Sequence, residues 1–129
     1  MFDAIEIQEQ LKDALTEGKR EIGAQITAQQ KAMETIESPG VLDEKTKLLV
    51  ALGAIAHTRC EDCVSLHMPR IVASGATKEE VMEAAAVAIC FGGGPVMAFV
   101  TTVIGPAYDQ FKALARHQAG DADESGLFD

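Results

Sequence analysis

The chain has 129 residues, of which 47% are hydrophobic and 5% aromatic, and its 20 acidic and 11 basic side chains give a net charge of -9. This length and apolar fraction are typical of one compact domain and argue against two independent domains or a disordered chain. The acidic charge, with no cluster of Lys and Arg, argues against nucleic acid and against anionic membranes as partners.

The start of the chain lacks the basic flank and apolar run of a secretory signal, so we expect a cytoplasmic protein. In a reducing compartment, a close cysteine pair is more often redox-active or metal-binding than structural. The chain has three cysteines, Cys60, Cys63 and Cys90. Cys90 lies in an apolar stretch, where we expect a small buried residue.

Period-two alternation and hairpin turns are nearly absent, which predicts an all-helical fold. The segment 3–37 is predicted to form one long or two shorter amphipathic helices, with Gly18 and Gly23 as weak points, and Ser38-Pro39-Gly40 ends it. Its apolar stripe consists of Ile7, Leu11, Leu15, Ile22, Ile26, Met33 and Ile36.

Two further helices are predicted before residue 76. Asp43 is expected to cap a helix that runs to about His57, and another helix is expected from near Cys60 to Gly75. Pro69 lies inside the second of them and predicts a bend, because proline removes a backbone hydrogen bond.

The remainder predicts a capping box from Thr77 to Glu80, which begins an Ala-rich helix expected to be central and buried. Residues 84–108 carry no charge, but the glycines before Pro95 favour short buried helices over a membrane span. The last helix should begin near Pro95 and be divided at Gly105-Pro106. We expect residues 1–119 to form a single domain and the acidic tail 120–129 to be disordered.

Cys60, Cys63 and His67 are the residues whose spacing indicates chemistry. Two cysteines three apart at the first turn of a helix can form a disulfide, and the positive helix end stabilises a thiolate. His67 lies four residues after Cys63, so its imidazole is predicted to be within proton-transfer reach of that sulfur. Cys60 is then placed to attack an oxidised Cys63.

Zinc binding is the main alternative from the residues alone. His57, Cys60, Cys63 and His67 could supply a tetrahedral set of ligands. Zinc ligands usually come from two separate loops or turns instead of one helix, so the redox interpretation is preferred. We expect no bound metal and no flavin or nicotinamide cofactor, because no binding fingerprint for them is present.

Residues 42–108, about half of the chain, resemble the alkylhydroperoxidase D-like branch of the carboxymuconolactone decarboxylase family. The resemblance is carried by four spaced motifs, which are Asp43-Glu44-Lys45-Thr46, Cys60-x-x-Cys63-x-x-x-His67, Gly75-Ala76-Thr77-Lys78-Glu79-Glu80 and Phe91-Gly92-Gly93-Gly94-Pro95. It implies a compact, oligomeric, all-α helical bundle, usually a homotrimer or a homohexamer.

The resemblance also implies roles for the site residues. Cys63 would attack the hydroperoxide, Cys60 would resolve the oxidised sulfur with electrons from a dithiol partner protein or a small thiol, and His67 would belong to a proton relay. The family's peroxidases carry a relay glutamate twelve residues before the first cysteine, where this chain has Leu48. Glu44 and His57 are the candidates to replace it.

The sequence therefore predicts an alkylhydroperoxidase-like peroxidase or disulfide reductase in which Cys60, Cys63 and His67, with Glu44 or His57, carry the reaction. A zinc-binding or structural helical oligomer is one alternative. A decarboxylase acting on a cyclic lactone is another, although the resemblance implies that decarboxylase members lack the cysteine pair.

Overall fold

The computed structural model describes residues 1–126, with side chains as far as residue 120, and within that part of the chain every regular element is helical. The elements are α1 (Ala4–Glu37), α2 (Glu44–Thr58), α3 (Glu61–Ala73), α4 (Lys78–Val87), α5 (Ile89–Gly92), α6 (Gly94–Phe99), the π-helical turn η1 (Val100–Ile104) and α7 (Gly105–Gly126). No helix in the described part is long and apolar enough to cross a membrane.

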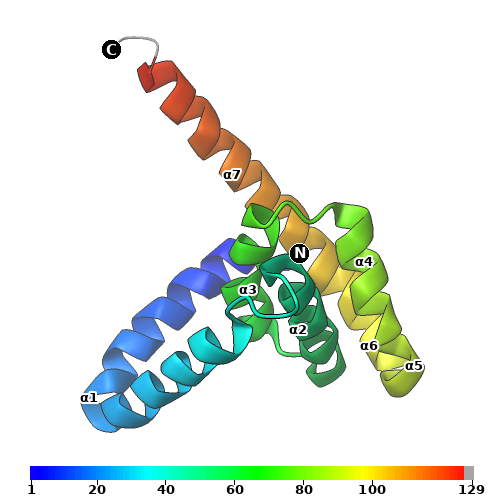
Figure 1. The fold of residues 1–129 in the computed structure, drawn as a ribbon, viewed down its shortest axis with the longest axis horizontal. Coiled ribbons are helices and arrows are strands. Elements are labelled where there is room, and N and C mark those ends of the chain that lie inside the picture. Colours follow the sequence, from blue (N-terminus) through cyan, green and yellow to red (C-terminus); the bar gives the residue numbers. More distant parts are fainter. Residues whose placement is uncertain (127–129) are drawn as a thin grey trace.

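Helix α1 is folded into two arms. Its helical geometry breaks at Ile22, where φ is -126° and ψ is 41°, between the glycines predicted as weak points. The two arms lie side by side and project from the bundle (Figure 1, blue and cyan). Gln110 of α7 fixes the start of the first arm, because its Oε1 accepts from the Ala4 N–H at 2.7 Å and its Nε2 donates to the Phe2 carbonyl at 2.6 Å.

The predicted caps of α2 and α4 are confirmed. The Asp43 side chain accepts from the Thr46 N–H at 2.8 Å. Thr77 and Glu80 form both hydrogen bonds of a capping box, which satisfies two backbone N–H groups at the start of α4. These bonds fix the first turns of the two helices, which pack against each other.

The core lies where α2 and α3 pack against α4, η1 and the first half of α7. Its largest fully buried side chains are Leu48, Leu52, Met68, Ile71 and Ile104. Leu48 has no exposed surface, which confirms its interpretation as a core residue.

The prediction that α4 and its continuation are central and buried is wrong. Val87 is 61% exposed and Phe91 is 79% exposed, and Cys90 is exposed instead of buried. A run of Ala and Val has little amphipathic contrast, so the sequence does not indicate which face packs inward. In Figure 1 α4 and α5 lie at one side of the bundle. Helix α4 packs against α2, η1 and α7, and α5 packs against α2 and α6, which leaves their other faces exposed.

Helix α7 leaves the bundle in its second half (Figure 1) and continues as far as Gly126. It therefore includes residues 120–126, which belong to the segment that we expected to be disordered. Residues 127–129, the rest of that segment, lie outside the described residues.

Candidate active site

The cysteine pair lies at the N-terminal end of α3. Arg59, in the left-handed conformation with φ 55°, ends α2, and the next residue, Cys60, is the N-cap of α3. The Cys60 sulfur accepts from the Cys63 N–H at 3.1 Å and is joined to Cys63 in a disulfide whose Cα atoms are 5.2 Å apart. This helix end favours a thiolate after reduction, while the acidic Glu61 and Asp62 of the first turn oppose it.

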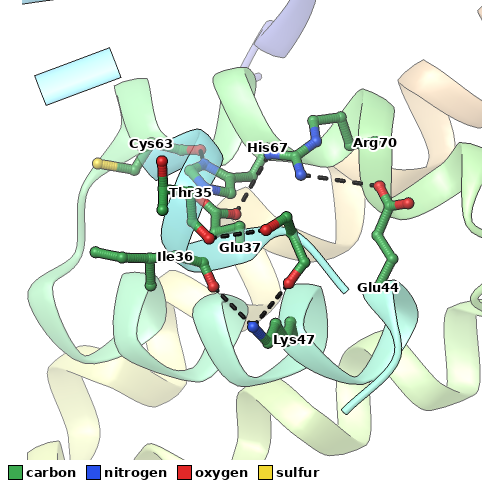
Figure 2. Close-up of polar contacts among 9 residues, drawn as sticks. Thr35, Ile36, Glu37, Glu44, Lys47, Cys63, His67 and Arg70 are labelled. Atoms are coloured by element: carbon green, nitrogen blue, oxygen red, sulfur yellow. Dashed lines mark hydrogen bonds and ion pairs between the residues drawn. The ribbon is translucent and has the colours of Figure 1, made fainter. Parts of the chain in front are cut away.

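His67 is buried one turn after Cys63 and is held through both ring nitrogens. Its Nδ1 lies 3.2 Å from the Cys63 carbonyl oxygen, and its Nε2 lies 2.9 Å from Oε1 of Glu37. In Figure 2 the Cys63 side chain extends away from the imidazole. In the disulfide form, the ring therefore contacts the Cys63 backbone and not its sulfur.

The two ring contacts limit the protons that this cluster can carry. Both nitrogens face oxygen atoms, whereas a neutral imidazole has only one N–H to donate. Both contacts are hydrogen bonds when an imidazolium faces a carboxylate, or when a neutral ring faces a protonated Glu37. When a neutral ring faces a carboxylate, one of the two contacts lacks a hydrogen.

Glu37 is the last residue of α1 and is only 9% exposed. Its second oxygen, Oε2, lies 3.3 Å from Nη1 of Arg70, and Nη2 of Arg70 lies 3.8 Å from Oε1 of Glu44. Arg70 is three residues after His67, so both side chains leave α3 on the side that faces the end of α1 (Figure 2). A buried carboxylate therefore sits between an imidazole and a guanidinium.

The five residues predicted for the site do not all come together. Cys60, Cys63 and His67 lie within the first two turns of α3, and Glu44 lines the open cleft beside the site and pairs with Arg70 at 3.8 Å. His57 is exposed near the end of α2, and its Nδ1 lies close to Gly92, beside a separate cavity of about 620 Å³.

Sequence reasoning missed Glu37. Its sequence signal is a glutamate four residues after Met33, on the same face of the helix, directly before Ser38. We predicted Ile36 for the apolar stripe instead, but Ile36 is 69% exposed, whereas Glu37 is buried. That part of the prediction is wrong, because Glu37 and not Ile36 faces α3, where it pairs with His67 and Arg70.

An open cleft of about 760 Å³ lies between the two arms of α1 and the first turns of α3. Polar groups of the site, including Glu37, Cys63, His67 and Arg70, line one part of it. The rest is mainly apolar and is lined by Leu11, Leu15, Ile22, Ile26, Met33 and Leu66. A molecule that enters this cleft can thus reach Cys63.

The four residues of the zinc alternative do not form a ligand set. The two cysteine sulfurs are bonded to each other, and His57 lines a different cavity from His67. Among the residues with described side chains, no group of three or more His, Cys, Asp or Glu is arranged to hold a metal ion.

Known proteins with similar sequences and structures point to one family. The sequence profile of the carboxymuconolactone decarboxylase family matches residues 24–104. This match begins 18 residues before residues 42–108, over which the sequence was found to resemble the family. An uncharacterized protein of Cupriavidus necator is 35% identical over 92 residues, which cover 66% of this chain and 81% of that protein.

Two solved structures share the fold. A carboxymuconolactone decarboxylase family protein of Legionella pneumophila is 26% identical, with a TM-score of 0.78 over 84% of this chain and 96% of the other. A family member from Thermotoga maritima, for which involvement in an antioxidative response has been suggested, is 28% identical, with a TM-score of 0.68 over 88% of this chain and 92% of the other. With the profile matched over more than half of its length, this chain belongs to the carboxymuconolactone decarboxylase family.

Proposed function

We propose that this protein is a thiol-dependent oxidoreductase that reduces hydroperoxides, with Cys63 as the nucleophile, Cys60 as the resolving thiol and His67 with Glu37 as the proton relay. The observation that carries the proposal is the buried His67–Glu37 pair one turn from a Cys60–Cys63 disulfide. The antioxidative role suggested for the Thermotoga maritima relative supports it.

The peroxide step begins from the reduced pair. The Cys63 thiolate attacks the terminal oxygen of a hydroperoxide, so the O–O bond breaks and an S–O bond forms. The leaving alkoxide takes a proton from the relay and departs as an alcohol, while Cys63 becomes a sulfenic acid. The peroxide is reduced by two electrons and the sulfur is oxidised by two.

The Cys60 thiol then attacks the sulfenic sulfur, which forms the disulfide and releases water. A dithiol partner protein or a small thiol must return the enzyme to its reduced form. Exchange with a dithiol leaves two cysteine thiols on this chain and a disulfide on the donor, so electrons and protons balance.

The relay needs a side-chain movement that reduction permits. Cys63 and His67 are four residues apart on α3, so their side chains share a helix face. When the disulfide opens, Cys63 is free to change its χ1 rotamer and to bring its sulfur toward the imidazole. Glu37 then takes the place of the glutamate that the family's peroxidases carry where this chain has Leu48.

Reduction of disulfides is a second candidate, favoured by the hydrogen bond from the Cys63 N–H to the Cys60 sulfur at 3.1 Å. This bond stabilises Cys60 as a thiolate, which is the attacking group when a reduced pair resolves the mixed disulfide on Cys63 and releases the substrate thiol. We further propose a homotrimer or homohexamer, as the resemblance implies.

The proposal is tested by following reduced protein during single turnovers with hydrogen peroxide, an organic hydroperoxide and a small disulfide. The native protein and the Cys60→Ser, Cys63→Ser and His67→Ala variants are compared, and sulfenic acid is trapped and located by mass. We expect a trapped sulfenate on Cys63 in Cys60→Ser, and no turnover in Cys63→Ser.

Cys90→Ser is the matched control, because Cys90 is exposed and lies on α5 outside the cleft. It should keep the native rate. If Cys63 exchanges rapidly with disulfides but forms no sulfenate, the protein is a disulfide reductase and not a peroxidase. Activity on a cyclic lactone that survives both cysteine substitutions would favour the decarboxylase alternative.

A further inference from the structure

We infer that Lys47 is a positioning residue for Glu37, an inference that rests on the relay of the proposed function. Lys47 lies on α2, and its Nζ donates to two carbonyl oxygens at the end of α1 (Figure 2). One is that of Ile36, at 2.9 Å, and the other is that of Ser38, at 2.7 Å. The two carbonyls flank Glu37, so one ammonium holds the backbone on both sides of the relay carboxylate.

The end of α1 needs such a donor. The last carbonyls of a helix have no partner within it and form its negative end, where a cation is favourable. Many helices end in a backbone cap made by the N–H of the residue after the C-cap, but here that residue is Pro39, which has no N–H. The last turn of α1 also contains no basic side chain.

The remaining contacts divide the work between backbone and side chain. The Ser38 hydroxyl donates to the Thr35 carbonyl at 2.8 Å, which leaves the Ile36 carbonyl to Lys47. Arg70 and His67 bind the Glu37 carboxylate from α3. Lys47 therefore fixes the position of the Glu37 backbone, while Arg70 and His67 fix the position of its carboxylate.

Loss of Lys47 should loosen the last turn of α1 and move the carboxylate from Nε2 of His67. Small displacements of a catalytic group can lower a rate by up to about 10²-fold. Because Arg70 still attracts the carboxylate, we expect a smaller loss, about tenfold, in the reactivity of Cys63 near neutral pH.

The experiment measures the rate of Cys63 alkylation by iodoacetamide against pH in reduced protein that carries Cys60→Ser and Cys90→Ser, because the exposed Cys90 thiol would also react. Lys47→Met should lower the rate and shift the pH profile toward that of Glu37→Gln. Lys47→Arg, which keeps a cation with several donors, should restore most of the native profile. Lys45→Met is the matched control. Lys45 lies on α2 like Lys47, but its Nζ pairs with Glu80 of α4 at 2.7 Å, so this variant should leave the profile unchanged.

A double-mutant cycle separates positioning from general stability. In protein that also carries Glu37→Gln, Lys47→Met should have no further effect on the pH profile, because the carboxylate that Lys47 positions is then absent. Independent, additive effects would overturn the inference. If Lys47→Met does not fold, Lys47→Gln takes its place, because glutamine keeps an N–H donor without the charge. Lys47→Gln should give an intermediate pH profile. A native pH profile in Lys47→Gln would overturn the inference.

The two proposals can fail separately. A shifted profile in Glu37→Gln with a native profile in Lys47→Met overturns the role of Lys47 and leaves the relay intact. A native profile in both variants overturns the relay and the inference together.

Discussion

The carboxylate of Glu37 lies 2.9 Å from Nε2 of His67, although the two residues are 30 positions apart. The contact joins the end of α1 to the middle of α3, one turn from the Cys60–Cys63 disulfide. It places a buried carboxyl group directly against the imidazole.

Glu37→Gln should slow peroxide reduction by about 10²-fold, the lower range for loss of a general acid-base group. Glutamine keeps the size and the hydrogen-bonding capacity of the side chain, so the change removes mainly the charge. Single-turnover rates of the reduced protein measure the effect.

Glu44→Gln and His57→Gln are the controls for this prediction. Glu44 lines the cleft but pairs with Arg70 instead of His67, and His57 is exposed beside a separate cavity, so both variants should keep rates near native. A rate loss in either variant as large as that of Glu37→Gln would assign the relay to that residue instead.

Local chemistry explains why several elements were predictable. Asp43 and Thr77 cap their helices through bonds to residues three positions away, so a short sequence window contains all the information. The cysteine pair at the start of α3 is equally local, and Leu48 follows from the helical period of α2.

Glu37 depends on packing between distant segments, which the sequence does not display. From Met33, both Ile36 and Glu37 lie on nearly the same helix face, and hydrophobicity favours Ile36 as the inward residue. The packing of α3, with His67 and Arg70 ready to pair with a carboxylate, makes Glu37 the buried one. Exposed Cys90 is a similar case, because an Ala-rich helix has no clear apolar face.

Leu48→Glu would place a glutamate where the family's peroxidases carry one, but we expect loss of stability instead of gain of activity. Leu48 is fully buried, and a charge there would have no partner. Leu48→Ala should cost about 2–5 kcal/mol in the free energy of unfolding, and Leu48→Met less than about 1.5 kcal/mol. Urea unfolding measures the series, with Leu48→Glu the least stable member, and a Leu48→Glu protein as stable as the native one would contradict the assignment.

The apolar cleft predicts a preference for substrates with an apolar body. Met33→Gln should raise the KM for an apolar organic hydroperoxide and leave that for hydrogen peroxide nearly unchanged, because only the former would contact the lining. Steady-state kinetics with both substrates measure the ratio. Met97→Gln is the control, since Met97 is exposed and lies outside the cleft, and equal losses with both peroxides in Met33→Gln would contradict a binding role.

The capping box of α4 predicts a pH-dependent contribution to stability. The ammonium of Lys45 and the N–H of Thr77 hold the pKa of Glu80 below its usual range. A carboxyl group whose pKa is lower in the folded state stabilises the fold above its unfolded pKa, and this contribution is lost as the pH falls through the folded pKa. Glu80→Gln, which keeps a residue able to close the capping box, should be less stable than the native protein at neutral pH. The difference in the free energy of unfolding should disappear in acid, as measured by urea unfolding across the pH range.

Glu79→Gln, one residue earlier, is the control and should show a smaller difference in the free energy of unfolding. A difference for Glu80→Gln that persists at low pH would show that the charge is not its cause.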